Sequence, residues 1–379
     1  MPWNALFRLA RKIGAPHHAL GAAKAVEPLT HQDTKAAIKE LSQAVRNNPE
    51  SIEIYLALGN LYRSQGDIER AIHIRTSLID RPGLDNALKA RCHFELGRDF
   101  LRGGMLDKAR QSFEKTRDIE GDSEGIELEL ARLAADAGAF EQAAEHYKRI
   151  NRPMAVAHFL ARQAREHFRL SEEKQGDALL TEALTIFPAS PEAWLASVVQ
   201  SALSTNPERL ATALRAACTN VPAPQRFLLL EDLLEALSSC RVEDPANPNR
   251  TVLSPVVIST MVQTSVSVLA EFPPDALLCY YCAKFCLFEA DRDNAKHWLE
   301  KSLVLNSEFW LARLELVTLV LVDQELTPFL REQLAYFIGN ARKSKRFVCQ
   351  SCGFRWDKTF FVCPRCRSWH SILFRQEFS

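Results

Sequence analysis

This sequence of 379 residues lacks several features that mark a membrane-spanning or nucleic-acid-binding protein. No run of about 18 apolar residues occurs in it, so no segment is expected to span a bilayer. Lysine plus arginine and aspartate plus glutamate number 47 each. No excess charge therefore draws the chain as a whole to a nucleic acid or to an anionic membrane.

The motifs of common catalytic sites are also missing. There is no Gly-x-x-x-x-Gly-Lys phosphate loop, no Gly-x-Ser-x-Gly nucleophile turn and no His-Glu-x-x-His zinc site. The histidines are scattered, and isolated ones such as His158 and His297 are expected at surface or packing positions. The sequence therefore predicts a binding protein and not an enzyme.

Cysteine, in contrast, is plentiful, with ten residues and no signal peptide at the start of the sequence. This usage predicts a reducing compartment and hence a cytoplasmic protein. Four of the cysteines form two Cys-x-x-Cys pairs separated by ten residues, Cys349/Cys352 and Cys363/Cys366. Two such pairs supply the four thiolates of a tetrahedral metal site. The alternatives are two disulfides or four free thiols.

The residues around these cysteines favour the metal site. Gly353 gives the first turn backbone freedom, and Pro364 stiffens the second. Between the pairs, apolar residues alternate with polar ones as in a short hairpin, at Phe354, Trp356, Phe360 and Val362. With all four positions filled by protein, the metal is expected to be structural, with zinc favoured and iron as the alternative. A small β-rich, rubredoxin-like or zinc-ribbon domain is predicted over residues 347–379.

Three further cysteines resemble ligands, namely Cys279, Cys282 and Cys286. Their spacing of three and four places them on one face of a helix, and a fourth ligand is missing. We therefore expect them to pack in the core as small hydrophobic residues.

Between residues 25 and 222 the sequence repeats with a period of about 34 residues; the pattern weakens after Pro222, and one further pair follows at Ala283 and Ala295. Small residues recur twelve positions apart, as two closely crossing helices require, at Gly59/Ala71, Gly97/Ala109, Ala131/Ala143, Ala164/Gly176 and Ala283/Ala295. Glycines mark the turns between the paired helices at Gly66, Gly104 and Gly138, and prolines end repeats at Pro49, Pro188 and Pro222. This pattern is typical of tetratricopeptide repeats, and a helical bundle without repeats is the alternative.

The predicted fold is therefore an all-α tetratricopeptide-repeat superhelix over residues 25–322, followed by a final helix and basic linker over 323–346 and then by the ribbon. A loop rich in proline and asparagine is expected at residues 242–251. Stacked repeats of this kind curve into a superhelix whose concave face binds an extended peptide or a partner's surface.

The first 24 residues form a separate N-terminal segment and lead-in. Residues 1–13 have the spacing of a basic amphipathic helix, with Trp3, Leu6 and Phe7 on the apolar side. Such a helix either lies in a membrane interface or packs against the first repeat, and a disordered start is the third alternative.

Basic residues gather near the ribbon, where eight of them stand against one acid, Asp357, between Arg342 and Arg367. They are Arg342, Lys343, Lys345, Arg346, Arg355, Lys358, Arg365 and Arg367. This stretch is expected either to meet an acidic partner, a phosphate or a lipid headgroup, or to form a solvated surface. Behind the last cysteine, an apolar tail of Trp369, Ile372, Leu373 and Phe374 is expected to pack on the ribbon or to dock it against the repeats.

The repeats containing LALGNLYRSQGDIERAIHIR, LGRDFLRGGMLDKARQSF and VAHFLARQAREHF, followed by CQSCGFRWDKTFFVCPRCRSWHSI, resemble the bacterial lipopolysaccharide assembly protein B family. The resemblance implies a rubredoxin-type site whose four ligands correspond to Cys349, Cys352, Cys363 and Cys366. It also implies an adaptor on the cytoplasmic side of the inner membrane, which helps a membrane AAA+ protease degrade the deacetylase that commits carbon to lipid A. An inner-membrane regulator is a further implied partner.

One departure from the family concerns the N-terminus, because family members begin with a transmembrane helix and this sequence begins with MPWNALFRLARKI. Three explanations are considered. Either this segment anchors the protein at the membrane surface, or the start of the sequence is misassigned, or this relative acts in solution. Two alternative functions also remain open at this point. One is nucleic-acid binding through the basic ribbon, and the other is electron transfer by iron in the ribbon.

Overall fold

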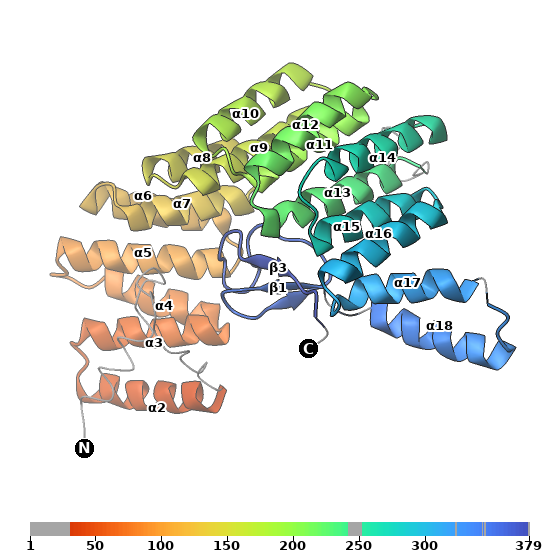
Figure 1. Cartoon of the computed structure of the whole chain (residues 1–379). Coiled ribbons are helices and arrows are strands. Elements are labelled where there is room, and N and C mark those ends of the chain that lie inside the picture. Colours follow the sequence, from red (N-terminus) through yellow and green to blue (C-terminus); the bar gives the residue numbers. More distant parts are fainter. Residues whose placement is uncertain (1–30, 242–251, 323, 343, 345, 378–379) are drawn as a thin grey trace. The chain divides into compact units, whose positions relative to one another are not determined.

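The computed structural model describes residues 31–241, 252–322, 324–342, 344 and 346–377, which form a series of helices followed by a small sheet (Figure 1). The chain divides into two compact units, Met1–Arg152 and Pro153–Ser379. In the described ranges, no helix combines the length and apolar character that crossing a bilayer requires. The N-terminal segment of residues 1–24 and the loop expected at 242–251 lie outside the described residues.

The first unit consists of antiparallel helix pairs. Its helices are α2 (His31–Asn47), α3 (Ile52–Gln65), α4 (Ile68–Ile79), α5 (Asn86–Arg102), α6 (Leu106–Glu120), α7 (Glu124–Asp136) and α8 (Phe140–Arg149). The turn between α3 and α4 shows why the chain reverses there. Gly66 adopts a positive φ of 84° at the end of α3, and the side chain of Asp67 then caps α4 by accepting a hydrogen bond from the backbone N–H of Arg70.

The small residues lie where the paired helices cross, as predicted. A Cβ atom on Gly97 of α5 would lie 2.6 Å from the ring of Phe113 on α6, and Ala109 is fully buried beside it. Ala71, Ala131 and Ala143 are also fully buried. The close helix crossing therefore leaves no room for larger side chains.

The first complete repeat departs from this pattern at Arg75, which is fully buried where the next repeat has Phe113. Its guanidinium covers Gly59, whose Cβ would lie 3.1 Å from Cζ. Arg75 Nε donates to Oδ2 of Asp99 at 2.8 Å, and the other oxygen of Asp99 accepts from Arg63 at 2.9 Å. A buried ion network thus joins α3, α4 and α5, which the repeat pattern did not predict.

The second unit continues the helix pairs. Its helices are α9 (Pro153–Arg169), α10 (Glu173–Ile186), α11 (Pro191–Leu203), α12 (Pro207–Asn220), the 3-10 helix η1 (Ala223–Gln225), α13 (Arg226–Ser239), α14 (Pro255–Ala270), α15 (Ala276–Phe288), α16 (Arg292–Leu305), α17 (Trp310–Val322) and α18 (Pro328–Arg342). Helices α10 and α12 end just before Pro188 and Pro222, where the sequence predicted the ends of repeats.

The cysteines of α15 pack in the core of this unit. Cys279 and Cys282 are each 1% exposed, and Cys286 is 8% exposed. Burial raises the pKa of the Cys286 thiol to about 11, so this thiol stays protonated at neutral pH. These environments agree with the predicted packing role.

The chain ends in a three-stranded antiparallel sheet of order β2-β1-β3, formed by β1 (Phe347–Cys349), β2 (Arg355–Trp356) and β3 (Ile372–Phe374). Of the short hairpin expected between the cysteine pairs, Arg355–Trp356 forms a strand of the sheet, whereas Val362 forms an isolated bridge with Trp369. The first cysteine turn brings β1 and β2 together directly, because the backbone N–H of Cys349 donates to the carbonyl of Phe354 at 2.8 Å.

The predicted fold class, helical repeats followed by a small β-rich domain, is confirmed. The predicted domain boundaries at residues 24, 322 and 346 stay predictions. Figure 1 shows the sheet beside the helices of the second unit, to which it belongs.

Candidate metal centre

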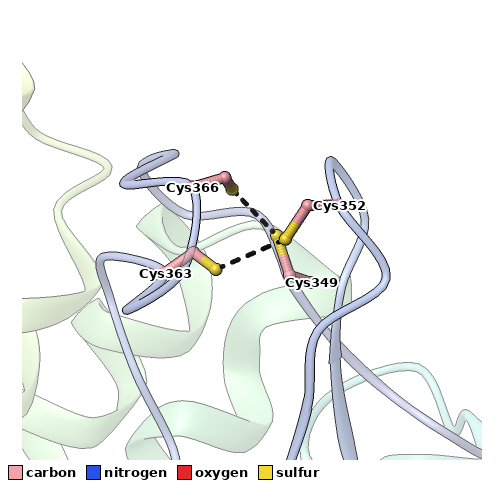
Figure 2. A group of neighbouring side chains, drawn as sticks. All are labelled: Cys349, Cys352, Cys363 and Cys366. Carbon is pink, nitrogen blue, oxygen red and sulfur yellow. Dashed lines mark hydrogen bonds between the residues drawn. The ribbon is translucent and has the colours of Figure 1, made fainter. Parts of the chain in front are cut away.

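Two turns of similar construction carry the four cysteines (Figure 2). In the first turn, the backbone N–H of Gly353 donates to the carbonyl of Cys349 at 2.8 Å, and Gly353 has a φ of 69°. In the second, the N–H of Arg367 donates to the carbonyl of Cys363 at 2.9 Å, and Arg367 has a φ of 58°. The expected role of Gly353 is thus confirmed, whereas the left-handed conformation of Arg367 was not predicted.

The four sulfur atoms point toward one another. The Sγ atoms of Cys349 and Cys366 are 3.6 Å apart, those of Cys352 and Cys363 are 3.7 Å apart, and all four lie within 4.8 Å of one another. Thiolates at about 2.3 Å from a tetrahedral zinc ion are about 3.8 Å from each other. The four cysteines are therefore placed to hold one metal ion.

Hydrogen bonds prepare at least one of these sulfurs to be a thiolate. Burial by itself would raise the pKa of Cys349, but the hydroxyl of Ser371, 3.2 Å from its Sγ, and the backbone N–H groups of Ser351 and Cys352 lower it to about 6. The hydroxyl of Ser368 lies 3.2 Å from the Sγ of Cys366. Such contacts orient and tune the ligands of metal sites.

The cysteine ribbon, residues 346–377, packs on the helices of its own unit through aromatic side chains. The ring of Phe347 stacks on Phe227 of α13, with centroids 5.5 Å apart. Phe374 contacts the rings of Phe227, Tyr280 on α15 and Phe309, with centroids 5.7 to 6.1 Å apart. The expectation that the apolar tail docks the ribbon against the repeats is confirmed.

A buried carboxylate adds a polar link between the ribbon and the repeats. Nε2 of His370, in the ribbon, lies 2.8 and 2.9 Å from the two carboxylate oxygens of Glu192 on α11, and Nδ1 of His158 on α9 lies 3.0 Å from one of them. Burial alone would raise the pKa of Glu192, but the hydrogen bonds and charge of the two histidines lower it to about 2. Sequence reasoning missed this cluster, because its members are far apart in the sequence and belong to no motif.

The basic residues near the ribbon fall into two groups. Arg342 pairs with Glu315 at 2.9 Å, and Arg346 pairs with Glu231 at 2.9 Å, so both bind the repeats. The other described ones are exposed on the ribbon, at Arg355, Lys358, Arg365 and Arg367. Lys343 and Lys345 lie outside the described residues.

Two similar proteins found by comparison with known proteins share the name Lipopolysaccharide assembly protein B. No protein-family model matches the chain. Lipopolysaccharide assembly protein B of Escherichia coli strain K12 is 22% identical, over 91% of this chain and 86% of the relative. The protein of the same name from Haemophilus influenzae is 23% identical, over 87% of this chain and 82% of the relative.

Two solved structures of repeat proteins are also similar. One is a tetratricopeptide repeat protein from Parabacteroides merdae, with 15% identity and a TM-score of 0.35 over 75% of this chain and 98% of that one. The other is the C-terminal part of a repeat protein from Cytophaga hutchinsonii, with 13% identity and a TM-score of 0.40. The match covers 82% of this chain and 98% of that one. The resemblance that the repeats and the cysteine ribbon indicated is confirmed, since this chain is similar along 91% of its length to a protein named Lipopolysaccharide assembly protein B.

Proposed function

We propose that this protein is a non-enzymatic adaptor that regulates lipopolysaccharide synthesis. In this role it presents the deacetylase that commits carbon to lipid A to a membrane AAA+ protease, at the cytoplasmic face of the inner membrane. The observation that carries the proposal is that the similarity to Lipopolysaccharide assembly protein B extends over 91% of this chain and 86% of that protein. Stacked helical repeats are protein-binding scaffolds, which supports the same role.

We also propose that Cys349, Cys352, Cys363 and Cys366 hold one structural metal ion, zinc in the first place and iron as the alternative. Four protein ligands leave no position for a water molecule, so the ion would stabilise the ribbon without performing catalysis. It would fix both cysteine turns and thereby keep Phe347 and His370 on the repeat helices. Elemental analysis of protein purified without oxygen distinguishes the metals, since a colourless protein with one zinc per chain removes the iron-based electron-transfer alternative.

The adaptor role can be tested by a pull-down from the bacterium that encodes the protein. Three tagged forms would be compared: the wild type, Cys363→Ser, and Cys286→Ala as a control that removes a buried thiol outside the cluster. We expect the wild type and the control to recover a membrane AAA+ protease and the lipid A deacetylase, and Cys363→Ser to recover neither. Recovery of neither protein by the wild type would contradict the proposal.

Nucleic-acid binding is the second candidate, which the exposed cations of the ribbon, such as Arg355, Arg365 and Arg367, favour. Titration of labelled RNA and DNA at increasing salt concentration tests it, because binding to phosphates must weaken as salt rises. Absence of binding at low salt would remove this candidate.

A further inference from the structure

A groove of about 1140 Å³ lies within the second unit, between repeat helices and the ribbon. Helices α13, α15 and α17 contribute one set of lining residues. Arg342, Ser344, Arg346 and Phe347, together with the ribbon residues 357–359, contribute the other. A volume of this size is in the range that holds a sizeable ligand rather than a few water molecules.

Part of the lining is apolar and accessible. Leu234, Leu287 and Leu319 come from three different helices, and each is only partly buried. They give the groove apolar surface that the apolar side chains of an occupant would cover.

Among the described residues, some carboxylates that line the groove have a paired cation and others do not. Glu231 and Glu315 are neutralised by Arg346 and Arg342, as described above. Asp232 and Glu235, one turn apart on α13, form no ion pair within the part of the chain that the structure describes, although the charge of Arg165 acts on Asp232. Asp232 accepts a hydrogen bond from the hydroxyl of Thr359 at 2.9 Å.

The two carboxylates point to a cationic ligand. Burial, followed by the charges of Glu235 and Glu231, outweighs the Thr359 hydrogen bond and the charge of Arg165, and raises the pKa of Asp232 to about 6. Asp232 is therefore ionised at neutral pH in a place that penalises its charge, a feature that is frequent at binding sites. Phosphate-bearing ligands are disfavoured by the same carboxylates. Lys284 and Lys358 also line the groove and would suit the carbonyls or acidic groups of a peptide.

We infer that this groove binds an extended peptide segment of a protein partner, in which a lysine or arginine stands between apolar residues. The cation would face Asp232 and Glu235, and its apolar neighbours would cover Leu234, Leu287 and Leu319. This inference rests on the proposed adaptor function, for which it names the chemistry of the bound segment.

The test uses the full chain loaded with metal and a phage-displayed library of random peptides of about 12 residues. Enriched peptides would be synthesised and their dissociation constants measured for four proteins. These are the wild type, the double variant Asp232→Asn with Glu235→Gln, the groove-blocking variant Leu287→Arg, and the control Glu208→Gln, which changes an exposed residue of α12 that does not line the groove. The asparagine side chain of the double variant keeps an acceptor for the hydroxyl of Thr359, so this variant changes charge with little change of shape.

We expect the enriched peptides to contain a basic residue flanked by apolar ones and to bind the wild type and the control equally. Binding should weaken about tenfold in the double variant, since a desolvated charge pair is lost, and disappear in Leu287→Arg. The inference would be overturned if no peptide is enriched or if the enriched peptides lack a basic residue. It would also be overturned if the peptides bind the wild type and the double variant with equal affinity. Circular dichroism and metal content would establish that each variant is folded.

The outcomes separate this inference from the proposed function. If the double variant binds peptides as well as the wild type while the pull-down still recovers protease and deacetylase, the groove assignment is wrong and the adaptor role stands. If peptides bind as expected but the pull-down recovers neither protein, the groove stands and the identity of the partners is wrong.

Discussion

The link between Glu192 and the two histidines allows a quantitative prediction about how firmly the ribbon is held. An ordinary glutamic acid has a pKa of 4.5, whereas Glu192 has a pKa of about 2 in the folded protein. At 1.36 kcal/mol per pH unit, this difference corresponds to roughly 3 kcal/mol of stabilisation at neutral pH. The folded protein holds the proton of Glu192 more weakly than the unfolded chain. The stabilisation is therefore complete above pH 4.5 and is lost as the pH falls toward 2.

The variant Glu192→Gln removes the charge but keeps the size of the side chain. His158 on α9 supplies part of this stabilisation and does not belong to the ribbon, so we expect the free energy of local opening of the ribbon to fall by about half of it, roughly 1.4 kcal/mol at pH 7. This corresponds to exchange that is faster by about tenfold. Hydrogen exchange followed by mass spectrometry on peptides covering residues 188–203 and 360–377 would measure it. Peptides from the first unit should exchange at wild-type rates, because repeats are stabilised mainly by their neighbours.

The control is Glu208→Gln, an exposed glutamate on the neighbouring helix α12, for which we expect no change beyond about threefold. Exchange in Glu192→Gln within threefold of the wild type would refute the reasoning. It would mean that aromatic packing around Phe347 and Phe374 holds the ribbon without help from the buried carboxylate.

Three further predictions concern packing, charge and metal. Gly97→Ala should destabilise the first unit by about 1–3 kcal/mol, because the new Cβ would lie 2.6 Å from the ring of Phe113. Gly339→Ala, whose Cβ would have no atom within 4 Å, should stabilise its helix by about 0.5–1 kcal/mol. Thermal melts of the two variants and the wild type measure both effects. Asp232→Asn should stabilise the protein by about 3 kcal/mol at pH 7, because the raised pKa of Asp232 means that the stability of the wild type falls as the pH rises from 3.8 to about 6. Equal urea midpoints of the two proteins at pH 7 would contradict this. Cys349→Ser and Cys366→Ser should lose the metal while keeping most of the helical circular dichroism, and collapse of the whole spectrum would show that the repeats depend on the ribbon.

The parts of the fold that were predictable from sequence are those governed by local patterns. Small residues twelve positions apart identified the helix crossings at Gly97 and Ala109, because steric exclusion at a crossing acts on single positions. The paired cysteines identified the candidate metal centre for the same reason, since ligand spacing is a property of one short turn.

The features that escaped prediction depend on residues brought together by the tertiary fold. His370 and Glu192 are 178 positions apart in the sequence, and no local pattern marks either one. Arg75 occupies a repeat position that carries an aromatic residue in the next repeat, and only the fold reveals that Asp99 neutralises it. The pairing of β2 with β1 was missed because alternation identifies a strand but not its partner.

The central claim is that this protein promotes degradation of the deacetylase that commits carbon to lipid A. The most direct test is the half-life of that enzyme in the native bacterium after protein synthesis is stopped, in cells that have or lack this protein. We expect the half-life to lengthen when the protein is absent, to return to normal with the wild type or Cys286→Ala, and to remain long with Cys363→Ser. A half-life that is the same with and without the protein would contradict the claim.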